Sequence, residues 1–162
     1  MEAANYCFEH KLGRLYGWFS REGLRLLRLP TPDQRYNRIP VLHSSMNDHR
    51  VWALHAVLEP YFAGVRQDFS QIPLDLSSGT HFQSMVWHAL RDIPWGETIT
   101  YGELARRIGM PGAARAVGQA VGANPIPILL PCHRVRAASG LGGFSAGIEW
   151  KKELLSVEGV IL

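Results

Sequence analysis

The chain has 162 residues, of which 46% are hydrophobic and 19% are charged, and its formal net charge is +3. This composition is typical of a soluble globular protein with one core or two small subdomains, and it excludes disordered and fibrous classes. No apolar stretch is long enough for a membrane span, and no secretory signal begins the chain. We therefore expect a cytoplasmic protein without a membrane partner, nucleoid-associated in a bacterium or nuclear in a eukaryote. The basic residues are scattered apart from the pairs Arg106-Arg107 and Lys151-Lys152, so the charge alone indicates no more than a solvated surface.

The two cysteines, Cys7 and Cys132, lie far apart, and in a reducing cytosol we expect free thiols. The histidines His43, His49 and His55 recur every six residues, a spacing seen in zinc sites. No closely spaced cysteine pair accompanies them. We therefore predict no metal and no other cofactor, and the role of Cys7 stays open.

In the first half of the chain, short apolar runs alternate with turn residues over residues 3–30, which predicts a small antiparallel sheet of hairpins. A polar loop follows, to about Asn47. Asp48 is then the predicted N-cap of a helix that ends near Gly64. Its apolar residues follow a helical period: Val51, Trp52, Leu54, His55, Leu58 and Tyr61. The turn-rich segment 68–79 marks a boundary, which predicts an N-terminal α/β domain over residues 1–78 and a second domain over 79–162.

The second half is predicted to be helical. Thr80 is a plausible cap for a helix that ends at Pro94-Trp95-Gly96, and Thr98 or Thr100 caps the next helix. This next helix covers residues 101–108, and two more helices are predicted at residues 113–122 and 148–157. The helices at 101–108 and 113–122, separated by a glycine-containing turn, resemble a helix-turn-helix. The expected fold class is α+β, with a small N-terminal antiparallel sheet and a helix followed by a helical, winged helix-turn-helix-like domain.

The segment NPIPILLPCHRV, residues 124–135, contains three prolines, which predict a rigid, non-helical approach to Cys132. A thiolate is the reactive form of cysteine, and the adjacent His133 is placed to act as its base. Such a base needs an orienting carboxylate, for which Glu149 and Glu158 both lie downstream. A lone Cys-His pair is more often structural, so these residues alone leave both interpretations open.

The helix AARAVGQAVG, residues 113–122, consists almost entirely of small residues. Small residues at helical spacing indicate tight helix packing, but they also allow close approach to the minor groove of DNA. Arg115 is hard to explain as packing, because burying an unpaired charge is costly. Tyr101, at the start of the preceding helix, suits a core or capping aromatic equally well.

The motif PCHRV, preceded by NPIPILL, resembles the active-site signature of the O6-alkylguanine-DNA alkyltransferases, or methylated-DNA–protein-cysteine methyltransferases. The resemblance covers residues 82–135 and 139–159 strongly and the first half of the chain more loosely. It implies a ribonuclease H-like N-terminal domain. It also implies an enzyme of a single turnover that moves an alkyl group from O6 of guanine, after nucleotide flipping, irreversibly to Cys132. O4 of thymine stays open as a second position.

The resemblance also implies roles for individual residues. Cys132 matches the alkyl acceptor, and His133 matches the base that draws off its proton through a water. Glu158 matches the carboxylate that orients the histidine, and Asn124 matches the asparagine that braces the preceding turn. Tyr101 matches the tyrosine whose hydroxyl serves the leaving guanine and meets the DNA backbone.

The implied partner is double-stranded DNA containing O6-alkylguanine, bound through the minor groove by a monomer. Arg115 matches the arginine that fills the hole left by the extruded nucleotide. Further DNA contacts are expected from Tyr101 and from the small residues of the helix, Ala113, Ala114, Ala116 and Gly118. The residues expected to form the pocket for the base are Val121, Pro127, Val135, Phe144 and Ser145.

Three other classes are weighed against this one. A non-catalytic lesion-binding protein of the same fold would lack the cysteine, which this chain keeps at position 132. A helix-turn-helix regulator would need several base-reading side chains, whereas this helix offers Arg115 and Gln119. A cysteine hydrolase is disfavoured because Pro131, and not a helix N-terminus, adjoins the cysteine.

Overall fold

The computed structural model describes residues 2–34, 37–42 and 47–162. It divides the chain into two compact units, Met1–Asp75 and Leu76–Leu162. The sequence placed a domain boundary after residue 78. His43, one of the three regularly spaced histidines, lies outside the described residues.

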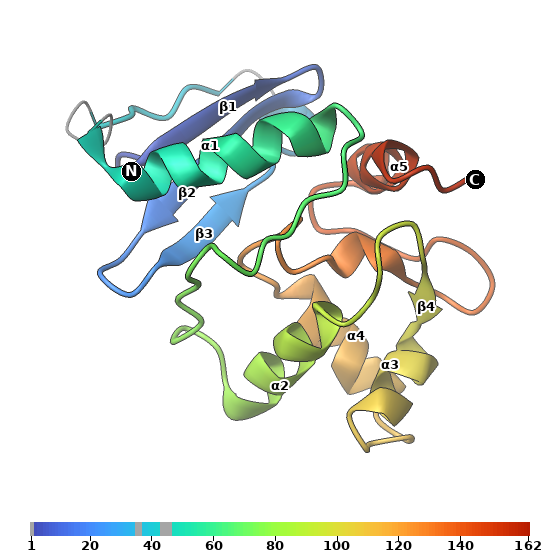
Figure 1. Cartoon of the computed structure of the whole chain (residues 1–162). Coiled ribbons are helices and arrows are strands. Elements are labelled where there is room, and N and C mark those ends of the chain that lie inside the picture. Colours follow the sequence, from blue (N-terminus) through green and yellow to red (C-terminus); the bar gives the residue numbers. More distant parts are fainter. Residues whose placement is uncertain (1, 35–36, 43–46) are drawn as a thin grey trace. The chain divides into compact units, whose positions relative to one another are not determined.

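The first unit contains a three-stranded antiparallel sheet in the order β1-β2-β3. Its strands are β1 (Tyr6–His10), β2 (Gly13–Phe19) and β3 (Leu24–Arg28). The predicted hairpins are therefore confirmed. The helix α1 (His49–Phe62) begins after Asp48, whose carboxylate accepts a hydrogen bond from the Arg50 amide at 2.9 Å. It lies across one face of the sheet (Figure 1).

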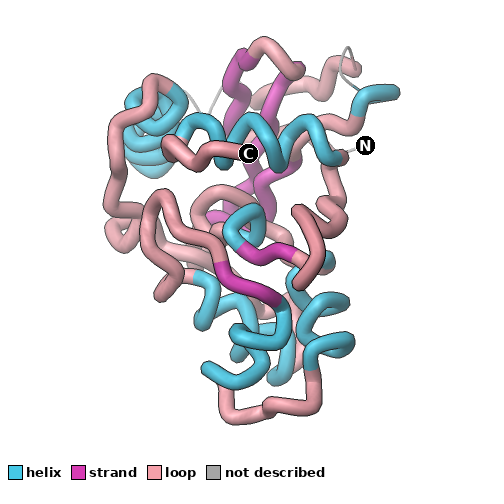
Figure 2. The backbone as a smooth tube through the Cα atoms, turned by 90° about the vertical axis from the view of Figure 1, so that its right-hand side faces the viewer, coloured by secondary structure: helices cyan, strands magenta, loops and turns pink. Residues whose placement is uncertain are grey.

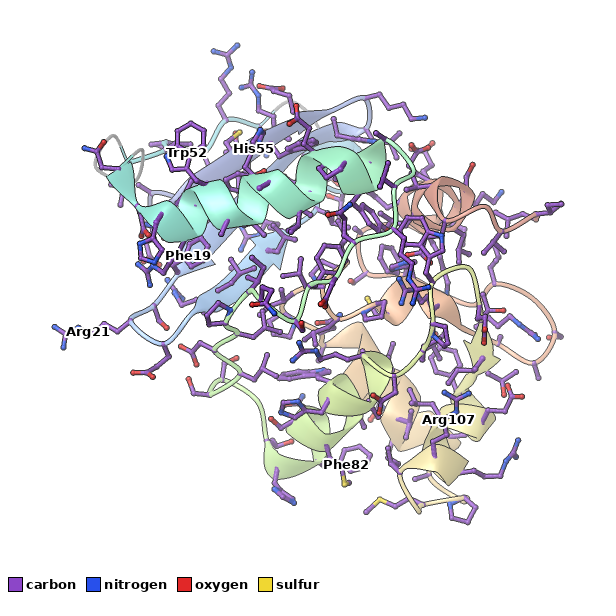
Figure 3. The ribbon with its side chains drawn as sticks, viewed as in Figure 1. Phe19, Arg21, Trp52, His55, Phe82 and Arg107 are labelled. Atoms are coloured by element: carbon purple, nitrogen blue, oxygen red, sulfur yellow. The ribbon has the colours of Figure 1, made fainter. Side chains whose placement is uncertain are left out.

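One part of the predicted apolar face of α1 is wrong. Leu54, Leu58 and Tyr61 are buried at spacings of four and three residues, so they share one face of the helix. Trp52, labelled in Figure 3, is 58% exposed, since it lies two residues before Leu54 and therefore on the other side of the helix. The loop predicted to be polar also buries Ile39, whose amide donates to the Tyr16 hydroxyl at 3.1 Å.

The second unit carries the remaining elements. The helices are α2 (His81–Leu90), α3 (Tyr101–Arg107), α4 (Ala114–Gly122) and α5 (Ile148–Val157), with a short 3₁₀ helix η3 (Cys132–Arg134). The strands β4 (Ile99–Thr100) and β5 (Val135–Arg136) pair in parallel. Figure 2 shows this pair of strands surrounded by helices and loops of the same unit. Within the described residues, no helix is long and apolar enough to cross a membrane.

Two capping boxes set the starts of α2 and α3. The Thr80 hydroxyl accepts from the Gln83 amide at 3.1 Å while Gln83 returns a bond to the Thr80 amide at 2.9 Å. Thr100 and Glu103 repeat the arrangement, so Thr100 is the cap of α3 and Thr98 is not. The helix α2 ends at Leu90, earlier than predicted, and turns occupy the residues before Gly96.

The core of the second unit forms where α4 packs against α2 and α3. The Trp87 indole of α2 donates to the Ala120 carbonyl of α4 at 2.8 Å, which joins the two helices through a buried hydrogen bond. The helices α3 and α4, with the turn between them, form the predicted helix-turn-helix. The prediction that residues 124–135 are not helical is wrong at its end, since Cys132–Arg134 forms the 3₁₀ turn η3.

Candidate active site

The turn that precedes Cys132 is held by Asn124. Its side-chain amide donates to the Leu130 carbonyl at 2.7 Å, and its side-chain oxygen accepts from the Ile126 amide at 2.9 Å. The same Leu130 carbonyl accepts from the Cys132 amide at 2.7 Å. Between them Ile128 has a φ of 75°, an unfavourable value for a β-branched residue that only a well-determined surrounding sustains. The backbone at Cys132 is thus fixed by several independent contacts.

Behind the cysteine, His133 and Glu158 form a buried pair. The distance from His133 Nε2 to Glu158 Oε1 is 2.6 Å, and both side chains are 0% exposed. Because an ionised carboxylate only accepts, Nε2 carries the proton and donates it, which leaves the lone pair on Nδ1. Among the described residues, His133 Nδ1 is a buried polar atom without a hydrogen-bond partner. Glu149, the other carboxylate considered, is exposed on α5.

Arg134 is the second cation on the same carboxylate. Its Nε donates to Glu158 Oε2 and its Nη2 to Glu158 Oε1, both at 2.9 Å, while Nη1 donates to the Ile93 carbonyl at 2.5 Å. Burial raises the pKa of Glu158, but the hydrogen bonds and charges of His133 and Arg134 outweigh it and bring the pKa to about 2. Burial lowers the pKa of His133 in spite of Glu158, so the imidazole is neutral at pH 7.

The thiol of Cys132 lines a cavity of about 230 Å³. The other lining residues are Tyr101, Gly118, Val121, Gly122, Gly143, Phe144 and Ser145. Three of the five predicted pocket residues, Val121, Phe144 and Ser145, are therefore in its wall. Val135 and Pro127 are not. Val135 is 0% exposed and pairs with Ile99 in the β4–β5 sheet, so its side chain belongs to the core.

The electrostatic surroundings of Cys132 favour the neutral thiol at rest. Burial raises its pKa to about 11, although a hydrogen bond with Asn124 and the charge of Lys151 act in the opposite direction. Burial also raises the pKa of Tyr101, and the nearby Cys132 adds to that shift. The thiol therefore needs a base to become a nucleophile at neutral pH, and Tyr101 keeps its proton for donation.

The small-residue helix α4 has two distinct faces. Val117, Ala120 and Val121 are buried, whereas Arg115 and Ala116 are exposed. The other residues predicted to contact DNA, Ala113, Ala114 and Gly118, are partly exposed. A Cβ atom added at Gly118 would lie 3.6 Å from the ring of Tyr101, an ordinary van der Waals contact, so the ring lies beside this part of the helix. Small residues thus serve tight packing on one face and leave an open surface on the other.

Two residues of this site carry no role in the sequence interpretation. Arg134 follows His133 within PCHRV, and Lys151 was assigned to a charged surface pair. A helical period gives the missing signal for Lys151. On α5 and its C-cap, the buried residues are Trp150, Lys151, Leu154, Leu155 and Glu158, which repeat at the spacing of one helix face.

Within the described part of the chain, no group of three or more histidine, cysteine or acidic side chains is placed to hold a metal ion.

Residues 81–160 match the family model described as the DNA-binding domain of 6-O-methylguanine DNA methyltransferase. The chain is 57% identical over 102 residues to a methylated-DNA–protein-cysteine methyltransferase of Mycobacterium bovis, an alignment covering 62% of this chain and 61% of the relative. It thus spans about three fifths of the length of that relative.

A second relative of the same name, from Metallosphaera sedula, is 41% identical over 119 residues, which is 74% of each chain. The crystal structure of Mycobacterium tuberculosis OGT in complex with DNA superposes with a TM-score of 0.79 at 42% identity, covering 94% of this chain and 91% of that one. Fold and site together define a helix-turn-helix domain built around a buried cysteine with a histidine and a carboxylate behind it. The chain belongs to the methylated-DNA–protein-cysteine methyltransferase family.

Proposed function

We propose that this protein repairs DNA alkylated at O6 of guanine by moving the alkyl group to Cys132 in a single, irreversible step. The observation that carries the proposal is that the Cys132 thiol lines a cavity while the neighbouring His133 presents an unpartnered, buried Nδ1. A histidine with a free ring nitrogen can take the proton of the neighbouring thiol, and the thiolate then forms beside a cavity that can admit a substrate. The names of the relatives support the same reaction.

His133 Nδ1 takes the thiol proton through a water, and the thiolate attacks the alkyl carbon, so that an S–C bond forms as the bond from that carbon to O6 breaks. The guanine leaves as an anion and is protonated with the help of the Tyr101 hydroxyl. Asn124 and Glu158 hold Cys132 and His133 in place. The thioether is stable to cellular thiols, so each molecule reacts once.

A base inside the duplex is out of reach of a buried thiol, so the nucleotide has to leave the stack. We propose that α4 approaches the minor groove with its exposed small residues and that Arg115 occupies the vacated position. The related M. tuberculosis protein was crystallised in complex with DNA, which supports a duplex as the partner. The cavity bounded by Val121, Phe144 and Ser145 would then receive the extruded base.

A stoichiometric titration tests the proposal. A duplex carrying one O6-[³H-methyl]guanine is added in increasing amounts, and we expect label in the protein to stop at one equivalent. Mass spectrometry of the peptides should find the methyl group on Cys132. Transfer that continues beyond one equivalent would indicate a turnover enzyme. Binding of the lesion without transfer would indicate the non-catalytic alternative.

Replacing Arg115 by alanine should slow transfer from duplex DNA by about 10- to 100-fold, because unstacking a base costs a few kcal/mol and the arginine offsets part of that cost. Transfer from free O6-benzylguanine should not change, since no duplex is opened. Arg107→Ala is the matched control, because Arg107 is also exposed and lies on α3 (Figure 3). Equal losses of transfer rate in the two variants would show that Arg115 contributes only a general attraction between its positive charge and the DNA phosphates.

A further inference from the structure

Lys151 is a fully buried lysine on α5, with 0% of its surface exposed. Its Nζ donates to three backbone carbonyls: Val135 at 2.6 Å, Leu141 at 2.5 Å and Gly143 at 3.1 Å. Among the described residues no carboxylate pairs with it. A buried ammonium without a counter-ion is costly, and the three carbonyl bonds offset part of that cost.

We infer that Lys151 is a positioning residue for alkyl transfer, which ties the cavity-lining loop to β5 and supplies the positive charge that stabilises the Cys132 thiolate. The inference rests on the proposed function and adds a residue to it. Two separate sets of observations support it, one on the loop and one on charge.

The loop bears directly on the cavity. Gly143, whose carbonyl accepts a hydrogen bond from Lys151, lines the same cavity as Cys132 and is followed by the lining residues Phe144 and Ser145. Leu141, the other acceptor in this loop, lies two residues before Gly143. Between the two acceptors, Gly142 has a φ of +74°, and a Cβ atom there would lie 3.1 Å from the Ala137 amide nitrogen. The backbone therefore folds back closely on itself at this point. The Lys151 ammonium binds the carbonyls on either side of Gly142 and also the carbonyl of Val135, the first residue of β5.

The positive charge of Lys151 acts on the Cys132 thiol. Lys151 acts to lower the pKa of Cys132, and Cys132 in turn acts to raise the pKa of Lys151, so the two groups lie within each other's field. Burial nevertheless brings the pKa of Lys151 down to about 8, which leaves it charged at pH 7. Arg134 is also cationic, but it is bound to the carboxylate of Glu158. Among the described residues, Lys151 is thus a cation that acts on the Cys132 thiol and has no carboxylate partner.

The experiment measures the pKa of the Cys132 thiol without DNA, from the pH dependence of iodoacetamide labelling of the Cys132 peptide. Lys151→Gln keeps side-chain donors for the carbonyls but removes the charge. We expect its thiol pKa to rise by about one unit or more and its alkyl transfer at pH 7.5 to fall about tenfold. Lys151→Arg, which keeps the charge, should restore most of the thiol reactivity. Lys152→Gln removes the same charge from the exposed neighbour and should change neither quantity.

An unchanged thiol pKa in Lys151→Gln, or an equal change in Lys152→Gln, would overturn the inference.

If Lys151→Gln does not fold, the wild-type protein supplies the same test. Above about pH 8, Lys151 loses its proton, and without that charge the pKa of the Cys132 thiol rises. The thiolate fraction then grows less steeply, so the logarithm of the labelling rate should rise by less than one per pH unit. His133 is already neutral and Tyr101 is still protonated in that range, because burial lowers the pKa of the first and raises the pKa of the second. A slope of one would contradict the role of the charge. Absence of transfer from DNA in the wild type would contradict the proposed function instead, and leaves the labelling result unaffected.

Discussion

Replacing Cys132 by alanine should abolish alkyl transfer to the protein, below any detectable rate, while binding of the alkylated duplex persists. Alanine has no lone pair to attack carbon, and the remaining residues of the site only position and deprotonate the nucleophile. The backbone at this position is held by its own amide bond to the Leu130 carbonyl and by the Asn124 amide on the same carbonyl, and both bonds remain when the sulfur and its hydrogen bond with Asn124 are removed. We therefore expect a change in the free energy of unfolding of only about 1 kcal/mol.

Two further variants sharpen this test. Cys132→Ser should also be inactive, because an alcohol is far less acidic than a thiol and His133 is a weak base. Cys7→Ala removes the other free cysteine, which lies on β1 in the first unit, and should transfer the label as the wild type does. The measurement is label transfer from methylated duplex, with gel-shift titration for binding. Label bound to Cys132→Ala would show that another residue accepts the alkyl group.

Replacing Glu158 by glutamine should destabilise the second unit by about 3 to 5 kcal/mol at pH 7, because it leaves the charge of Arg134 buried without a counter-ion. The same change should lower the transfer rate by on the order of 100-fold, since His133 exchanges a charged, accept-only partner for a neutral amide that can also donate, and its tautomer is no longer fixed. Chemical denaturation gives the stability, and single-turnover kinetics gives the rate. Glu149→Gln, on the exposed face of the same helix, should cost less than about 0.5 kcal/mol.

The stability difference should also depend on pH. The pKa of Glu158 is about 2 in the folded protein, well below the ordinary value of 4.5 that the unfolded chain has. A depressed pKa means that the folded state favours the ionised form, so the stabilisation is complete above pH 4.5 and is lost as the pH falls toward 2. The gap between wild type and Glu158→Gln should therefore narrow over that window by about 3 kcal/mol. A gap that stays constant with pH would contradict the ionic role of Glu158.

Local sequence determined much of the second unit. Thr80 and Thr100 each start a helix because a side chain three residues later completes a capping box, a contact that lies within one turn. The last helix begins and ends at the predicted residues 148 and 157, since its apolar period and the glycines around it are local signals. The proposed acceptor Cys132 and its histidine were also predicted from the sequence, because they are adjacent in a distinctive motif.

Only the tertiary structure decided how distant residues meet. The strands β4 and β5 are two residues long and pair across the chain, so neither has a period that predicts it. Trp52 faces outward because packing selects one face of α1 from an ambiguous apolar pattern. The environment of the nucleophile depends on the same kind of contact: Arg134 and His133 share a carboxylate 24 and 25 residues away, and Lys151 reaches carbonyls 8 to 16 residues away. The sequence by itself determined which group we propose as the nucleophile, whereas the burial of charges around that group arises only when the whole unit packs.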